Sequence, residues 1–150
     1  MAHSPSSIGQ ASYIYCIIGY VSTKKTRHAV YNINYHFVWC PKFRRAVLTG
    51  PVGDQLVQMI PQLVQDLGGE VLELVVRPDH VHLFASSPPT IVPYQIMHRT
   101  KAPTRHDLRE RFPQLKSRLP SLWTRAYYVG TAGNVSSETI RKYIEAQEGR

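Results

Sequence analysis

Residues 70–85 read EVLELVVRPDHVHLFA, two apolar runs joined by a short polar segment. Glu70–Val76 and His80–Ala85 have the aliphatic and β-branched content that favours strands. Arg77-Pro78-Asp79 between them has the residue types of a tight turn. This stretch therefore predicts a β-hairpin, and the rest of the fold can be worked out on either side of it.

The segment before the hairpin predicts one strand and one helix. Apolar residues alternate with mostly polar ones from residue 30 to Trp39, which is the period of a strand with one buried face. Pro41 ends this strand, and a basic loop follows. Val52–Leu67 has apolar residues at helical spacing, with a kink expected at Pro61 and a stop at the two glycines that follow.

The segment after the hairpin predicts two helical regions and one more strand. Ile91–Arg111 is expected to be helical but interrupted at Pro103, and Pro113–Pro120 to be an irregular connection. Arg125–Thr131 is expected to be a strand. A final helix, capped by Ser136 or Ser137, should run to about residue 147.

The resulting order is strand, helix, strand, strand, helix, strand, helix. This order predicts an α+β fold in which a four-stranded antiparallel sheet carries its helices on one face, the split βαβ plan of ferredoxin-like and RNA-recognition folds, with one extra C-terminal helix. Residues 1–27 read as an N-terminal extension of a domain formed by residues 28–150. Within the extension, Tyr13–Val21 could add a strand to a sheet edge or to a partner, and it is shorter than the ~20 residues that span a bilayer.

Composition indicates a packed, basic protein. The chain has 150 residues, which suits one domain, and 43% of them are hydrophobic. Its formal net charge of +8 favours a polyanionic partner, nucleic acid first and an anionic membrane second. Cys16 and Cys40 form no C-x-x-C pair, so a reducing cytoplasmic setting is the simpler interpretation.

His80-Val81-His82 is the first candidate for chemistry. Residues two apart on a strand point to the same face, so the two imidazoles project together and could bind one cation, while Val81 points into the core. Asp79 could accept a hydrogen bond from one of these imidazoles, without itself being a ligand of the metal. The alternative is that both histidines are simply half-exposed polar residues.

Tyr143 and Gln147 are the second candidate. They lie four residues apart on the predicted final helix and so share a side of it. The phenol could attack a phosphodiester, and the amide oxygen could complete a metal site. Arg141 and Lys142 would attract phosphate and ease formation of a phenolate. The alternative is a core tyrosine and a solvent-exposed glutamine.

Pro78–Leu83 resembles the HUH motif (His, hydrophobe, His) of the one-tyrosine transposases, which mobilise small bacterial and archaeal insertion sequences as single-stranded DNA. Tyr143–Gln147 is similar to the tyrosine-helix motif of that family, and Tyr35–Arg44 to its first strand and basic loop. Trp123 with Tyr127-Tyr128-Val129 is similar to its last strand. The resemblance covers residues 30–148 in order, but Lys101-Ala102-Pro103 stands where the family usually has Lys-Gly.

The resemblance implies a mechanism and its partners. Tyr143 would be the nucleophile that forms a 5′-phosphotyrosine, and His80, His82 and Gln147 would bind Mg²⁺ or Mn²⁺. Imidazole ligands favour Mn²⁺ of the two. The protein would be a homodimer that cleaves and rejoins single-stranded DNA at element ends, where it would recognise DNA hairpins.

Basic and aromatic side chains are candidates for DNA contacts. The cations could bind phosphates, and aromatic rings such as Phe43 and Tyr94 could stack on splayed bases. The candidates are Lys42, Phe43, Arg44, Arg45, Arg99, Lys101, Arg105, Arg141 and Lys142.

Three other functions remain open at the level of sequence. One is a non-catalytic RNA- or single-strand-binding module of the RNA-recognition type. Another is a metal-dependent hydrolase that activates water instead of tyrosine. The third is a domesticated transposase that processes palindromes with the same chemistry.

Overall fold

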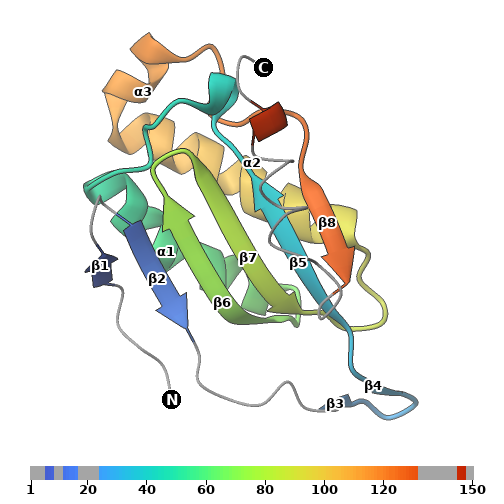
Figure 1. The fold of residues 1–150 in the computed structure, drawn as a ribbon. Helices are drawn as coiled ribbons and strands as arrows, with labels where there is room; N and C mark the ends of the chain where they lie inside the picture. Colours follow the sequence, from blue (N-terminus) through green and yellow to red (C-terminus); the bar gives the residue numbers. More distant parts are fainter. Residues whose placement is uncertain (1–5, 9–11, 17–23, 132–144, 148–150) are drawn as a thin grey trace.

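The computed structural model describes residues 6–8, 12–16, 24–131 and 145–147 (Figure 1). Most of these residues form a sheet and the helices that cover one of its faces. The elements in chain order are β1 (Ser6–Ile8), β2 (Ser12–Cys16), β3 (Lys24–Lys25), β4 (Val30–Tyr31), β5 (Asn34–Trp39), the 3₁₀ turn η1 (Lys42–Arg44), α1 (Pro51–Asp66), β6 (Glu70–Arg77), β7 (His80–Ser86), α2 (Pro93–Arg111), α3 (Pro113–Arg118) and β8 (Tyr128–Thr131).

The main sheet has the strand order β1-β2-β6-β7-β5-β8, and its neighbouring strands are antiparallel. Its four strands β6-β7-β5-β8 confirm the predicted four-stranded antiparallel sheet. The predicted hairpin is β6 and β7, with Arg77 opposite His80 across the turn. In the N-terminal extension, β2 pairs with β6 and β1 pairs with β2, so of the two possibilities left open for this segment the structure shows a strand added to a sheet edge. Figure 1 shows α1 and α2 together behind this sheet.

The core lies between the sheet and the helices, because alternate strand residues point toward α1 and α2. Phe37 and Trp39 of β5 and Leu83 of β7 are fully buried there against Leu56 and Ile60 of α1. Of the described helices α1, α2 and α3, none covers the opposite face of the sheet in Figure 1, and this face is called the open face below. The intervening strand residues, which include both histidines of β7, therefore point to the open face.

The predicted interruption at Pro103 is wrong, because α2 continues through it from Pro93 to Arg111. A proline removes only one helical hydrogen bond. Nearby, the Thr100 hydroxyl donates to the Ile96 carbonyl and the Thr104 hydroxyl to the Thr100 carbonyl, each at 2.6 Å. These hydroxyl bonds do not replace the bond that Pro103 removes. The burial of Ile96, Met97 and Leu108 on the apolar side of α2 offsets the local penalty.

Other boundaries also differ from the sequence prediction. The expected strand over residues 30–39 is two strands, β4 and β5, and the connection expected to be irregular contains α3. α1 runs through Pro61. The last strand begins at Tyr128 instead of Arg125, because the carbonyl groups just before it accept hydrogen bonds from Lys101. Of the predicted final helix, only 145–147 lie among the described residues.

None of the helices that the structure describes combines the length and apolar character needed to cross a bilayer.

Candidate functional site: a histidine pair on the open face of the sheet

β7 presents His80 and His82 side by side on the open face, as predicted. Both residues are half-buried, and Val81 between them is fully buried in the core. The hydrophobic residue therefore anchors the strand, while the two imidazoles remain available for chemistry. The paired strands β6 and β5 on either side of β7 hold this part of the backbone in place.

A chain of polar contacts supports His80. Its Nδ1 lies 2.9 Å from Oδ1 of Asp79, and Nε of Arg44 donates to Oδ2 of the same carboxylate at 2.8 Å. The hydrogen bond with His80 is the largest cause that lowers the pKa of Asp79 to about 2, and Arg44 adds to it. Asp79 is therefore an anion across the physiological range and holds one nitrogen of His80. Its role beside a metal stays a prediction.

His82 contacts a third imidazole that the sequence analysis did not select. Nε2 of His82 lies 3.1 Å from Nδ1 of His36 on β5, and the ring centroids are 5.1 Å apart. Burial, followed by the neighbouring His36 and His80, lowers the pKa of His82 to about 4. Burial also lowers the pKa of His36, against the opposing charge of Glu73. Both rings are therefore neutral at pH 7, which is the protonation state that metal coordination requires.

Gln147 is buried, with 4% of its surface exposed, which contradicts the alternative of a solvent-exposed glutamine. Its Oε1 has no hydrogen-bond partner within the described residues. A buried acceptor without a donor is costly, so a cation is a suitable partner for this oxygen. In the view of Figure 1, residues 145–147 lie toward the end of the sheet where β5 finishes and β8 begins. Tyr143, Arg141 and Lys142 lie outside the described residues.

The available donors fit a metal only if the amide takes part. In the described segments, no three histidine, cysteine or carboxylate side chains are placed to hold a metal ion. Two imidazoles and the Gln147 oxygen would make a set of three. Such a set leaves coordination positions open for phosphate and water, and its mixed nitrogen and oxygen donors suit Mn²⁺ and also accept Mg²⁺.

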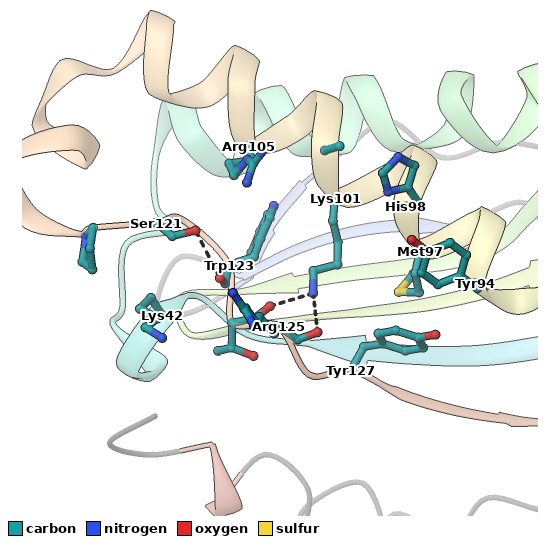
Figure 2. Close-up of a pocket in the computed structure, with 13 residues that line it drawn as sticks. Lys42, Tyr94, Met97, His98, Lys101, Arg105, Ser121, Trp123, Arg125 and Tyr127 are labelled. Atoms are coloured by element: carbon teal, nitrogen blue, oxygen red, sulfur yellow. Dashed lines mark hydrogen bonds between the residues drawn. The ribbon is translucent and has the colours of Figure 1, made fainter.

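A pocket of about 570 Å³ lies between α2 and the segment that leads into β8 (Figure 2). Three of the predicted DNA-binding residues, Lys42, Lys101 and Arg105, line it together with Arg125. Aromatic side chains line it as well, and among them Tyr94 is largely exposed. Cations beside exposed aromatic rings are the combination that binds unpaired nucleotides.

Lys101 has a structural role in this pocket that sequence did not reveal. Figure 2 shows it reaching from α2 toward the chain before β8. Its Nζ donates to the carbonyl oxygens of Thr124, Arg125 and Ala126 at 2.7, 3.3 and 3.4 Å. Burial lowers the pKa of Lys101 to about 8. Lys101 therefore fixes the entry to β8, and these carbonyl contacts explain why the strand starts late.

Of the other DNA-binding candidates that the structure describes, none lines the pocket. Arg44 is bound to Asp79, as described above. Phe43, Arg45 and Arg99 are exposed on the loop after β5 and on α2, and they do not line the pocket.

A split βαβ sheet with a His-hydrophobe-His strand on its open face is the arrangement expected of tyrosine-dependent DNA-processing enzymes. Comparison with known families agrees, since residues 29–147 match the family model described as "Transposase IS200 like". The chain therefore belongs to the IS200-like transposase family and is a DNA-processing enzyme.

Individual relatives support this assignment. The chain is 35% identical over 129 residues to the ISDra2 transposase TnpA of Deinococcus radiodurans. The alignment covers 85% of this chain and 92% of that protein. It is 29% identical over 126 residues to the transposase of insertion sequence IS200 from Salmonella typhimurium, covering 83% of this chain and 82% of the relative.

Solved structures agree with the fold. A crystal structure assigned as a transposase of Deinococcus radiodurans superposes with a TM-score of 0.78 at 32% identity, covering 85% of this chain and 99% of that one. A REP-associated tyrosine transposase bound to a REP hairpin superposes with a TM-score of 0.52 at 16% identity, covering 83% of this chain and 69% of that one, and supports the fold alone.

Proposed function

We propose that this transposase cleaves and rejoins single-stranded DNA at the ends of an insertion sequence, with Tyr143 as nucleophile and a divalent metal bound by His80, His82 and Gln147. The observation that carries the proposal is the site itself. Two imidazoles, His80 and His82, share the open face of β7, and a buried amide oxygen among the described residues lacks a donor. The enzyme would act in the cytoplasm, where bacterial and archaeal DNA lies.

The chemistry follows from the residue types. The phenol oxygen of Tyr143 would bond to phosphorus as its proton is lost, while the bond from phosphorus to the 3′ oxygen breaks and that oxygen takes up a proton. A bound Mg²⁺ or Mn²⁺ would supply charge stabilisation at the phosphate oxygens. The covalent 5′-phosphotyrosine conserves the diester bond energy, so attack by another 3′-OH rejoins strands without ATP.

We also propose that the pocket beside α2 contacts the DNA hairpin. Arg105 and Arg125 line the pocket and are exposed. Tyr94 and His98 also line it, and their rings stack with centroids 5.9 Å apart. The cations would bind phosphates and the rings would bind unpaired bases of the hairpin. The REP-associated relative, which was solved with a hairpin, is consistent with such a partner.

A homodimer is the further part of the proposal. The family resemblance implies it, and β8 is an outer strand of the described sheet with Val129 exposed. Size-exclusion chromatography with light scattering tests this part, and a monomeric mass over the micromolar range would contradict it.

The position of the label on the substrate tests the chemistry directly. Single-stranded DNA from one end of the insertion sequence is incubated with the protein and Mg²⁺ or Mn²⁺, and the products are separated on a denaturing gel. A 3′-labelled strand should give a protein-linked band, whereas a 5′-labelled strand should give only a shortened free product. Tyr143→Phe should abolish the adduct, His80→Ala and His82→Ala should weaken it, and Tyr31→Phe on β4 is the matched control.

Two outcomes would contradict the proposal. Cleavage without any adduct on the 3′-labelled strand would indicate a hydrolase that uses water. Binding without cleavage, unaltered by Tyr143→Phe, would indicate a non-catalytic nucleic-acid-binding module.

A further inference from the structure

The two histidines of β7 are supported in a parallel way, each through one ring nitrogen. Nδ1 of His80 lies 2.9 Å from the Asp79 carboxylate, which leaves Nε2 of His80 for another partner. Nε2 of His82 lies 3.1 Å from Nδ1 of His36, which leaves Nδ1 of His82. In metal sites, the ring nitrogen that does not bind the metal usually donates a hydrogen bond that fixes the ring and its tautomer.

The tautomer of His82 decides whether it can bind a metal. The two nitrogens are 3.1 Å apart, which is a hydrogen-bond distance, so one of them carries the proton and the other accepts it. If Nδ1–H of His36 donated, the remaining proton of His82 would occupy Nδ1, and His82 would have no nitrogen left for a cation. If Nε2–H of His82 donates to Nδ1 of His36, then Nδ1 of His82 keeps a free lone pair.

We infer that His36 is a positioning residue for His82, the counterpart of Asp79 for His80, and that His82 binds metal through Nδ1. His36 accepts the Nε2–H of His82 and so selects the tautomer and ring orientation that coordination needs. The inference rests on the proposed function, because it assigns His36 a role toward the metal proposed there.

The strand geometry gives His36 a fixed position for this role. β5 and β7 are paired so that His36 lies opposite Phe84 and Val38 lies opposite His82. The imidazole of His36 therefore lies diagonally across from that of His82. The His36 ring also contacts the Phe84 ring, with centroids 4.6 Å apart at 44°. Contacts with these two neighbouring rings restrict the ring of His36, and a fixed acceptor orients its donor.

Metal affinity tests the inference without relying on cleavage. Binding of Mn²⁺ to the full chain is measured by calorimetry and by electron paramagnetic resonance. His36→Phe keeps an aromatic ring beside Phe84 but has no acceptor, and it should weaken Mn²⁺ binding roughly 10- to 100-fold. His36→Asn presents a carbonyl oxygen near the position of Nδ1 and should restore most of the affinity. His28→Phe, at an exposed turn residue, is the matched control and should bind as the wild type does.

A second measurement reads the tautomer in the unaltered protein. Nitrogen-15 NMR of the histidine rings with a chelator present should show the proton of His82 on Nε2. In His36→Phe this preference should be lost, an effect that a purely structural role for His36 would not produce.

The outcomes separate this inference from the proposed function. Equal Mn²⁺ affinity of wild type and His36→Phe, or a proton on Nδ1 of His82, would overturn the role of His36 while leaving tyrosine chemistry intact. Absence of Mn²⁺ binding by the wild type would overturn both the metal site and this inference. A wild-type protein that binds Mn²⁺ normally but forms no covalent adduct with DNA would count against the proposed function alone.

Discussion

The wall of the pocket depends on a buried hydrogen bond whose removal has a calculable cost. Nε1 of Trp123 donates to the hydroxyl of Thr104 at 3.1 Å, and both residues are buried, at 5% and 0% exposure. Thr104→Val keeps the shape of the side chain but leaves the indole N–H without an acceptor. An unsatisfied buried donor costs about 1–3 kcal/mol, so we expect the free energy of unfolding to fall by that amount.

Thr100→Val is the matched control, because Thr100 is also fully buried on α2 and its hydroxyl donates to a helix carbonyl. That carbonyl belongs to the helix and keeps a backbone donor, so the control should cost less than about 1 kcal/mol. Urea unfolding at a fixed protein concentration measures both values. Trp123→Phe removes the N–H itself, and in that background Thr104→Val should cost about 1–2 kcal/mol less. Equal costs for Thr104→Val in both backgrounds would refute the reasoning.

Three further predictions follow from the pocket, the buried thiol and the metal site. Arg105→Ala should weaken binding of a DNA hairpin several-fold at 100 mM salt and reduce the salt dependence of binding by about one phosphate contact. Fluorescence anisotropy measures this binding, and Arg118→Ala, at an exposed position, is the control. Equal losses of affinity for both variants would contradict a role for the pocket. Burial raises the pKa of the Cys40 thiol to about 12. In a Cys16→Ser background, alkylation of Cys40 at pH 8 should therefore be negligible until urea unfolds the protein. Rapid alkylation of the native protein would show that the thiol is accessible and would contradict this prediction. Chelation of divalent metal should abolish the covalent DNA adduct and Gln147→Ala should weaken Mn²⁺ binding; an adduct that persists in excess chelator would exclude the metal from the reaction.

The sequence was sufficient for features that depend on local pattern. The period of two in β7 places Val81 inward and its neighbouring histidines outward, and the structure has this arrangement. The hairpin of β6 and β7 and the order of the central strands were predicted from turn chemistry and from the sequence of elements. Local pattern succeeds here because each strand buries one face against the same helices.

Features that depend on contacts between distant segments could not be predicted in this way. His36 and His82 are 46 residues apart, and only the register of β5 against β7 brings their nitrogens together. The phosphate contact predicted for Lys101 stays a prediction, but local pattern could not indicate that its ammonium group is bonded to carbonyls more than 20 residues away. The roles of Tyr143, Arg141 and Lys142 remain predictions, because these residues lie outside the described segments.

The turn after β5 has a consequence for efforts to engineer this protein. Phe43 and Arg44 both have positive φ, at 60° and 53°, a conformation that costs ordinary residues about 1–2 kcal/mol each. Phe43→Gly would remove this cost but would add about 0.5–1 kcal/mol of conformational entropy to the unfolded chain, so we expect only a small rise in the melting temperature. The same change would loosen the backbone that directs Arg44 toward Asp79, so a more heat-resistant version obtained here should be a slower enzyme.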